Sequence, residues 1–370
     1  MDAKSAMDNL RLRQSVGIVV QEDMVEFFKS NVRESVKIKI KFPDLINLLK
    51  MFDGITPLKE IADKYPGLKP EQLESLAFFL NSKNILIHQD CTYPTALINE
   101  KYRIINTLED YCHTASDVLD CIDKMKSSTV MIVGTGAVGS HVATYLAQCG
   151  VGSLVFVDND NVDISNLHRQ FFFEEDIGET KSSALFKSLK EIDPEINIKT
   201  IHAIIDDNFF TEITLPSKID LIINCADEPS VDYTSKLISS YCMLHRIPHI
   251  VGGGYNLHQT LIGQTIIPFE TACFNCFAIH LNKINSQDLA NVKKLHRVKR
   301  KLGSYSPLSG VAASLASLDA IKLLIGKTQY LQQASKRVEF SLRTLSFNIQ
   351  DVPRDPQCEW CGSENEKYNF

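Results

Sequence analysis

Apolar runs alternate with amphipathic stripes along the middle of the chain. Continuous apolar runs cover Thr129–Val133, Ser153–Val157 and Ile219–Cys225, and a helical stripe follows over His141–Cys149. Strands buried on both faces of a parallel sheet have near-continuous apolar sequences, and the helices that join them show one apolar face. We therefore predict an α/β fold over residues 96–370, with a Rossmann-like, mostly parallel sheet.

The first ninety-odd residues have a different pattern. Alternating apolar and polar positions predict strands over Ser15–Val20 and Val36–Ile40. Helical patterns follow near Leu45, Pro57 and Pro70, and a short strand is predicted at Ile85–Ile87. These elements predict a winged helix-turn-helix α+β module over residues 1–95, joined by a linker around Pro94 to the second domain, residues 96–370.

A winged helix suggests DNA binding, but its helix Pro70–Asn81 argues against this function. That helix has no Lys or Arg and carries Glu71 and Glu74, whereas phosphate contacts need positive charge. The net charge of −6 and the pI near 6.0 also give no support to a nucleic-acid or membrane-surface partner. Residues Met1–Ser5 begin no signal peptide, and we see no apolar run of membrane-spanning length, so we expect a cytoplasmic protein with no membrane partner.

A glycine-rich turn follows the first apolar run. Gly134, Gly136 and Gly139 stand between the strand and the helix, where a backbone without Cβ lets a phosphate approach the helix N-terminus. Asp158 ends the second strand, where an acidic residue can bind ribose hydroxyls. The glycine motif by itself is equally typical of a dinucleotide dehydrogenase.

Two cations change that interpretation. Arg169 and Lys181 come shortly after Asp158. A dehydrogenase does not need them, whereas cations aimed at developing phosphate charge accelerate phosphoryl and adenylyl transfer. The sequence therefore favours a nucleoside triphosphate that loses pyrophosphate.

Two acidic residues, Asp227 and Glu228, follow the apolar run that ends at Cys225. Open α/β sheets bind their ligands at the carboxyl ends of strands, and carboxylates suit Mg²⁺. Asp227 could instead cap the helix that begins near Ser230.

The ten cysteines include two Cys-x-x-Cys pairs, Cys273/Cys276 and Cys358/Cys361. Two such pairs fit one closed, tetrahedral, structural Zn²⁺ site. A thioredoxin-like redox motif is the alternative for either pair, although neither lies in a redox-fold context.

Residues 102–361 resemble the adenylation domain of the ubiquitin-activating-type superfamily, which includes ThiF, MoeB and MccB. The resemblance implies that the enzyme activates a carboxylate as an acyl-adenylate with ATP and Mg²⁺, and that it is a homodimer. The positions that it assigns to nucleotide and metal binding are Gly134, Gly136, Gly139, Asp158, Asp160, Ser165, Asn166, Arg169, Lys181, Asp227 and Glu228. It assigns catalytic roles to Arg169, Lys181 and Asp227, and makes Arg103 the nearest match to an arginine that reaches the triphosphate of a partner subunit. A solvated surface arginine is the alternative for Arg103.

The N-terminal module is similar to PqqD-like recognition elements, which implies a ribosomally made precursor peptide as partner, bound by its leader. The edge strand Val36–Ile40 could accept an extended peptide as an added strand. A purely structural cap is the alternative.

No cysteine occurs between Phe277 and Gln357, where relatives carry a nucleophile for thioester formation. We therefore expect adenylation without thioester transfer. The same segment has a basic run, Lys293–Lys301, which could attract a substrate with adjacent carboxylates or form a solvated face.

Three functions remain in competition: modification of a precursor peptide, activation of a sulfur-carrier protein, and binding through a degenerate nucleotide site. The intact Arg169, Lys181 and Asp227 disfavour the third, and the extra N-terminal module disfavours the second. For the first, the resemblance to a pantocin-forming member implies Glu–Glu cross-linking through a glutamate side chain. An MccB-type member instead adenylates a peptide C-terminus.

Overall fold

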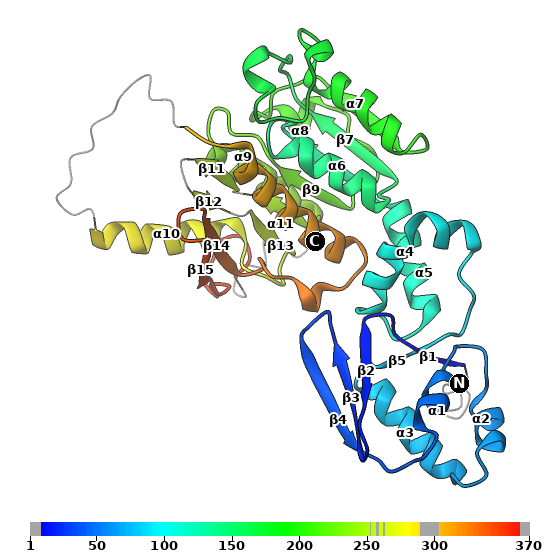
Figure 1. The fold of residues 1–370 in the computed structure, drawn as a ribbon. Helices are drawn as coiled ribbons and strands as arrows, with labels where there is room; N and C mark the ends of the chain where they lie inside the picture. Colours follow the sequence, from blue (N-terminus) through cyan, green and yellow to red (C-terminus); the bar gives the residue numbers. More distant parts are fainter. Residues whose placement is uncertain (1–8, 252, 257–258, 262, 289–302, 363–370) are drawn as a thin grey trace. The chain divides into compact units, whose positions relative to one another are not determined.

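The chain divides by its internal contacts into two units, residues 1–123 and 124–370 (Figure 1). The computed structural model describes residues 9–251, 253–256, 259–261, 263–288 and 303–362. The division falls after helix α4 (Thr95–Glu109), whereas the sequence analysis placed a linker before this helix. The domain boundary at 95/96 stays a prediction.

Unit 1 contains two small sheets and several helices. Its elements are β1 (Leu10–Leu12), β2 (Val16–Val20), β3 (Met24–Lys29), β4 (Glu34–Lys39), α1 (Leu45–Lys50), α2 (Leu58–Lys64), α3 (Pro70–Ser82), β5 (Leu86–His88), α4 and the first part of α5 (Ala115–Ser127). Strands β2, β3 and β4 form an antiparallel sheet, and β1 pairs with β5. The predicted strands and the three helices are present, while the winged helix-turn-helix assignment stays a prediction.

Strand β3 was missing from the sequence prediction. Its inward side chains Val25 and Phe27 are fully buried in the core of unit 1. Opposite them in the register lie Ile38 and Val36 of β4. Two adjacent phenylalanines, Phe27 and Phe28, obscure the alternation, because the second faces outward and is 40% exposed.

A buried arginine ties α4 and the loop that follows it to the N-terminal strands. Arg13 donates from Nε to the Leu86 carbonyl at 3.0 Å and from Nη2 to the Cys112 carbonyl at 2.8 Å, and Nη1 donates to the Glu109 carbonyl. Burial lowers the pKa of Arg13 from its usual value. The residues after the predicted linker are therefore held against the N-terminal strands.

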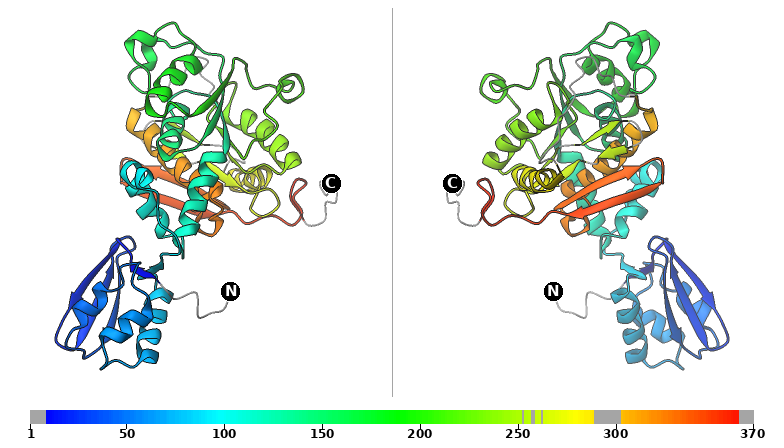
Figure 2. Two further views of the ribbon diagram at one scale, coloured as in Figure 1. Left: turned by 90° about the vertical axis from the view of Figure 1, so that its right-hand side faces the viewer. Right: turned by 90° about the vertical axis from the view of Figure 1, so that its left-hand side faces the viewer.

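A six-stranded sheet forms the centre of unit 2 (Figure 2). Its strands, in spatial order, are β13 (Gln264–Ile266), β10 (His249–Val251), β9 (Leu221–Asn224), β6 (Thr129–Val133), β7 (Ser153–Val157) and β8 (Asn197–Ile201). All neighbours are parallel except β13, which runs antiparallel to β10. From β6 the chain continues to β7 on one side and later to β9 on the other, so a topological switch point lies between β6 and β9. The mostly parallel α/β sheet is confirmed.

Helices pack on both faces of this sheet. The helices α6 (Gly139–Cys149), α7 (Lys181–Ile192) and α11 (Ser306–Leu324) share one hydrophobic core with the sheet, and α8 (Phe209–Glu212), α9 (Val231–His245) and α10 (Phe274–Asp288) share the other. Short 3-10 turns are η2 (Ile164–Asn166), η3 (Glu174–Asp176) and η4 (Thr328–Tyr330).

Helix α11 corrects one expectation of the sequence analysis. It is the one helix among the described residues whose length of 19 residues and mean hydropathy of 1.3 suffice to cross a membrane. Ala312, Ala313 and Ala320 are buried, and Ala313 and Ala320 belong to the core shared with α6. The helix therefore packs as a core element. A core helix can reach the same length and hydropathy as a membrane-spanning helix.

A second, antiparallel sheet completes unit 2. Its order is β11 (Gly254–Asn256), β12 (Gln259–Leu261), β14 (Lys336–Ser341) and β15 (Ser346–Asp351). The hydroxyl of Thr260 in β12 donates to the Leu308 carbonyl at 3.1 Å, which ties this sheet to α11. The sheet thus joins a distant part of the sequence to the segment that follows β10.

Candidate active site

The glycine loop after β6 packs directly on the loop after β9. Gly134 has φ +85°, and a Cβ there would lie 2.7 Å from the Ala226 nitrogen. A Cβ on Gly139 would lie 1.9 Å from the Gly134 oxygen. By contrast, a Cβ on Gly136 would meet only Gln170 Nε2, at 3.9 Å. Gly134 and Gly139 are therefore required by the fold itself, whereas Gly136 leaves open space.

Asp158 holds the glycine loop in place. Its Oδ2 accepts hydrogen bonds from the backbone and hydroxyl of Thr135 at 2.6 and 2.9 Å, and its Oδ1 accepts one from the Asp160 backbone at 2.8 Å. The residue is 8% exposed. These bonds connect the ends of β6 and β7, so the carboxylate positions the loop, and its role as a ribose ligand stays a prediction.

A cavity of about 330 Å³, which we call the glycine-loop cavity, lies at the carboxyl ends of β6, β7 and β9. Its polar and backbone lining includes Gly134, Gly136, Asp158, Asp160, Lys181, Asp227 and Glu228. Lys181 begins α7, and its Nζ lies 2.6 Å from Asp160 Oδ2. The structure thus brings together most of the residues that the sequence assigned to nucleotide binding.

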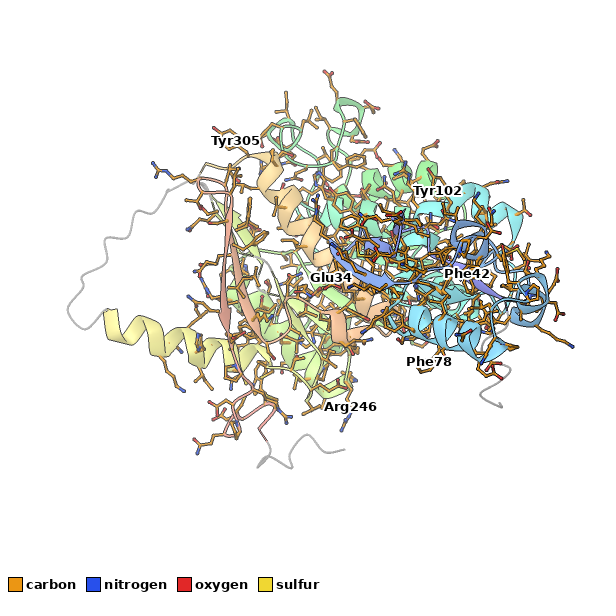
Figure 3. All side chains as sticks on the ribbon, turned by 60° about the horizontal axis from the view of Figure 1, so that its bottom comes forward. Glu34, Phe42, Phe78, Tyr102, Arg246 and Tyr305 are labelled. Atoms are coloured by element: carbon orange, nitrogen blue, oxygen red, sulfur yellow. The ribbon has the colours of Figure 1, made fainter. Side chains whose placement is uncertain are left out.

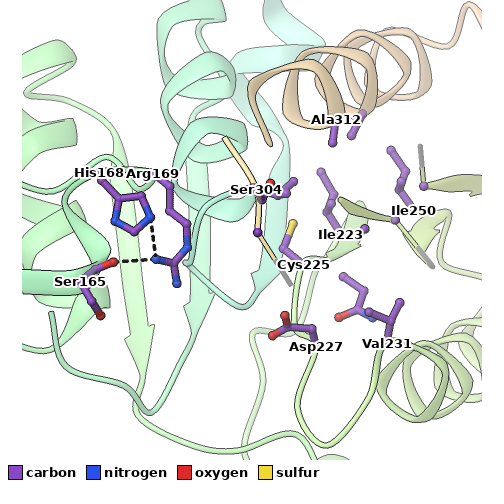
Figure 4. A pocket seen from close by; sticks show the side chains of 17 residues that line it. Ser165, His168, Arg169, Ile223, Cys225, Asp227, Val231, Ile250, Ser304 and Ala312 are labelled. Carbon is purple, nitrogen blue, oxygen red and sulfur yellow. Dashed lines mark hydrogen bonds between the residues drawn. The ribbon is translucent and has the colours of Figure 1, made fainter. Parts of the chain in front are cut away.

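A second cavity of about 710 Å³, the Arg169 cavity, lies beside the first (Figure 4). Arg169, His168 and Ser165 line one side of it, and Cys225 and Asp227 lie opposite them. Arg169 Nη1 donates to the Ser165 carbonyl at 2.6 Å and lies 3.4 Å from His168 Nε2. The guanidinium is therefore oriented by the turn that carries Arg169.

Glycines form another wall of the Arg169 cavity, which also includes Gly254 and Gly303. Among the described residues, a Cβ on either of these two glycines would meet no atom within 4 Å, and neither has a positive φ. Neither their backbone conformation nor their packing against the described part of the chain requires a glycine there. A wall without side chains leaves room for the main chain of a ligand.

Asp227 lines both cavities. A buried network holds the backbone beside it: Asn224 Nδ2 donates to Thr234 Oγ1 at 2.9 Å, and Thr234 Oγ1 donates to the Ala226 carbonyl at 2.9 Å. The helix α9 is capped by Ser230, whose Oγ accepts from the Tyr233 nitrogen at 3.2 Å. The alternative that Asp227 caps this helix is therefore wrong. Together with Glu228, Asp227 supplies carboxylate oxygens of the kind that Mg²⁺ prefers.

The sequence analysis missed Asn224 and Thr234 because neither stands in a recognisable motif. Asn224, a polar residue near the end of the apolar run 219–225, could have indicated such a network, since a buried amide needs hydrogen-bond partners. Asn224 is 7% exposed and Thr234 is fully buried.

Two predicted site residues have other surroundings. The Oδ1 of Asn166 accepts from the Asp163 backbone at 3.0 Å, so this buried amide caps η2. Arg103 belongs to unit 1, where its guanidinium lies 5.5 Å from the ring centre of Tyr102. The phosphate contact of Asn166 and the arginine-finger role of Arg103 stay predictions. The basic run at 293–301 lies outside the described residues.

Cys225 lies where the two cavities meet, since it lines both. Burial raises the pKa of its thiol to about 12, because a thiolate is poorly solvated there. At neutral pH this thiol is protonated and is a weak nucleophile.

The four cysteines of the two Cys-x-x-Cys pairs converge in unit 2. Their sulfur atoms lie within 4.8 Å of one another, and all four residues are buried. The Sγ atoms of Cys273 and Cys358 are 3.5 Å apart, and those of Cys276 and Cys361 are 3.4 Å apart. A disulfide would require about 2.05 Å, whereas tetrahedral thiolates at about 2.3 Å from a Zn²⁺ ion lie about 3.8 Å apart. The geometry fits a metal and not a pair of cystines.

Backbone groups support these sulfurs. The nitrogen atoms of Asp355 and Trp360 lie 3.4 Å from the Sγ atoms of Cys276 and Cys358, respectively. Such N–H groups stabilise thiolate charge and orient metal ligands. Among the described residues this cluster is the one group of three or more His, Cys, Asp or Glu ligands with metal-binding geometry.

Comparison with solved structures shows the same fold in two proteins. The crystal structure of Escherichia coli MccB with ATP has a TM-score of 0.76 and 23% identity, covering 95% of this chain and 99% of that chain. The structure of PaaA has a TM-score of 0.71 and 18% identity, covering 93% and 100%.

Two of the similar sequences belong to adenylyltransferases. The molybdopterin-synthase adenylyltransferase of Escherichia coli K12 is 29% identical over 244 residues, which cover 65% of this chain and 89% of that protein. The sulfur carrier protein ThiS adenylyltransferase of the same organism is 31% identical over 248 residues, covering 67% and 91%. The ThiF family matches residues 110–360, which is more than half of this chain. The chain therefore belongs to the ThiF family and is an ATP-dependent adenylating enzyme.

Proposed function

We propose that the enzyme adenylates a carboxylate of a ribosomally made precursor peptide, whose leader binds to the N-terminal unit. One observation carries this proposal: the likeness to MccB extends over 95% of the chain and thus over both units. The molybdopterin-synthase adenylyltransferase covers only 65% of this chain. One MccB structure is a complex with N-formylated MccA.

In this proposal ATP occupies the glycine-loop cavity. The backbone at Gly136 lies beside the phosphates, where the absence of Cβ leaves space. The Asp160 side chain is 54% exposed and is available to ribose hydroxyls, while Lys181 supplies positive charge to the phosphates. Asp227 and Glu228 would hold Mg²⁺, which supplies electrostatic stabilisation of phosphate charge.

The peptide carboxylate occupies the Arg169 cavity. Its oxygen attacks the α-phosphorus, the bond from that phosphorus to the bridging oxygen breaks, and pyrophosphate leaves. Both the carboxylate and the phosphates are negatively charged, and Arg169 stabilises this charge in the transition state. Asp227 lines both cavities, so the reacting groups would meet beside it.

The acyl group is then transferred without a protein thioester. The protonated Cys225 cannot serve as a strong nucleophile. A nucleophile of the peptide itself attacks the activated carbonyl, and AMP leaves. We propose that the activated carboxylate is a glutamate side chain. A nucleophilic atom of a neighbouring glutamate residue then attacks its carbonyl carbon and loses a proton, which cross-links the pair.

The leader pairs with β4 as an additional strand. Strand β4 contacts β3 on one side, and no strand pairs with its other side among the described residues. Backbone hydrogen bonds along a free edge provide affinity for an extended peptide, and side-chain pockets provide selectivity.

A second candidate function is adenylation of a sulfur-carrier protein, which the 29–31% identical relatives favour. A purified enzyme incubated with ATP, Mg²⁺ and either the precursor peptide encoded beside its gene or a sulfur-carrier protein distinguishes the two. Mass spectrometry should show loss of water within a glutamate pair of the peptide. Retention of AMP on the peptide C-terminus would instead identify MccB-type chemistry, and modification of only the carrier would overturn the proposal.

A further inference from the structure

The two faces of edge strand β4 differ in chemistry. Val36 and Ile38, together with Ile40 just beyond the strand, are partly buried against the core of unit 1. Lys37 and Lys39 alternate with them and are exposed. The strand thus presents apolar side chains on its inner face and ammonium groups on its outer face.

The ammonium groups of Lys37 and Lys39 differ in their neighbours on β3. Lys37 Nζ lies 3.6 Å from Glu26, which faces it from β3, while Met24 faces Lys39 in the same register. Lys39 makes no ion pair within 4 Å among the described residues. Lys29 and Glu34 pair at 2.8 Å at the other end of the strands. Beyond the opposite end, beside Phe42 (Figure 3), Glu22 and Asp44 line a cavity together with Lys41, and the Asp23 carbonyl accepts from the Ile40 nitrogen. The charges that the outer face of β4 itself presents are therefore those of Lys37 and Lys39.

An added strand would repeat this division of faces. Residues opposite each other in neighbouring strands point to the same face, with Cβ atoms about 4.5–5.5 Å apart. Opposite charges at such positions attract, and like charges repel. Side chains opposite Val36 and Ile38 would lie over the apolar core, and those opposite Lys37 and Lys39 would lie in solvent.

We propose that β4 binds an acidic extended peptide in which apolar residues alternate with Asp or Glu. The proposal rests on the proposed function, because it describes the leader that the N-terminal unit would read. Charge complementarity selects this partner over a second copy of β4, since antiparallel self-pairing would bring the lysines of two cationic strands close together. The simpler role of edge lysines, protection against aggregation, requires no acidic partner.

Fluorescence anisotropy with the full-length protein tests the proposal. The probes are three labelled ten-residue peptides: one alternates Val and Glu, one alternates Val and Lys, and one has the Val and Glu residues in two blocks. We expect the alternating acidic peptide to bind about tenfold more tightly than either other peptide, which corresponds to about 1.4 kcal/mol. The difference should shrink at high salt, because exposed charges are screened.

Charge reversal supplies the decisive comparison. The double variant Lys37→Glu/Lys39→Glu should prefer the Val/Lys peptide, whereas Lys64→Glu on α2 should keep the original preference. The milder variant Lys37→Gln/Lys39→Gln should lose discrimination, and circular dichroism verifies that each variant is folded.

Equal binding of the acidic and basic peptides, or an unchanged preference in both double variants, would overturn the proposal. If neither peptide binds while the full precursor is still processed, the acidic-strand inference is wrong and the proposed function stands. If the precursor is neither bound nor modified, the proposed function itself fails.

Discussion

The ammonium group of Lys181 lies 2.6 Å from the carboxylate of Asp160, beside the glycine-loop cavity. The two side chains differ in environment, since that of Lys181 is 9% exposed and that of Asp160 is 54% exposed. Asp160 can therefore turn towards solvent or a ligand, whereas the lysine is held by its surroundings. The pair neutralises a buried cation, and in the proposed function a phosphate of ATP would replace the carboxylate.

Lys181→Ala should reduce ATP–pyrophosphate exchange by roughly 10²-fold or more, as for loss of a group that stabilises transition-state charge. The fold should remain, because the exposed Asp160 that loses its partner is solvated. Lys187→Ala is the matched control, since this exposed lysine lies on the same helix and pairs with Glu179, which precedes the helix. Substantial exchange by the Lys181 variant would contradict the assignment.

The glycines of the loop should separate stability from nucleotide binding. Gly136→Ala should keep the melting temperature and weaken ATP binding, because its Cβ would enter space left open by the protein. Gly139→Ala should destabilise the fold by more than about 3 kcal/mol, since its Cβ would lie 1.9 Å from a backbone oxygen. Thermal unfolding and ATP titration measure the two effects. Equal destabilisation by both variants would show that Gly136, like Gly139, is required for stability, and would contradict the prediction.

Thr234 should act as a positioning residue for Asp227. Thr234→Val removes the hydrogen bond to the Ala226 carbonyl, so the loop that carries Asp227 should be less ordered. We expect roughly tenfold slower ATP–pyrophosphate exchange and a higher Mg²⁺ concentration for half-maximal rate. A purely structural role would lower the melting temperature without changing the Mg²⁺ dependence. Thr211→Val, which removes an exposed hydroxyl contact on α8, is the control.

Cys225 should be inert at neutral pH and dispensable for catalysis. Because burial raises its thiol pKa to about 12, the thiolate fraction stays small at pH 7–9 and grows only at higher pH. Alkylation of Cys225, followed by mass spectrometry, should therefore be slow over that range, and Cys225→Ala should still form product. A trapped thioester on Cys225 would overturn transfer without a thioester.

Purified protein should contain about one zinc ion per chain. Cys358→Ser should lose the metal and unfold at lower temperature, because metal binding to buried thiolates contributes to folding free energy. Cys91→Ser, at a partly exposed cysteine outside the cluster, should keep both the metal and the melting temperature. Elemental analysis provides the metal count, and undamaged protein without metal would defeat the assignment.

The sheet and the glycine loop followed from sequence because each depends on local pattern. Buried parallel strands require apolar runs, and the turn after β6 requires glycine at two of three positions. The strand β3 was missed because the inward Phe27 and outward Phe28 break the alternation.

Other features depend on contacts that sequence spacing does not reveal. Asn224 and Thr234 meet only when the strand β9 and the helix α9 pack, and Arg13 reaches carbonyls more than seventy residues away. Asn166 fits its motif but caps a 3-10 turn through its amide. A motif thus identifies positions near a ligand without separating those that contact it from those that shape the loop.

The cysteine cluster has a consequence for substrate selection. It fastens the segment after β15, and β15 pairs with β14, β14 with β12 and β12 with β11, whose first residue Gly254 lines the Arg169 cavity. The glycine-loop cavity is built instead on β6, β7 and β9. In the proposed function, metal supply would therefore govern how well a newly made chain selects the carboxylate that it activates, while its affinity for ATP would depend little on zinc.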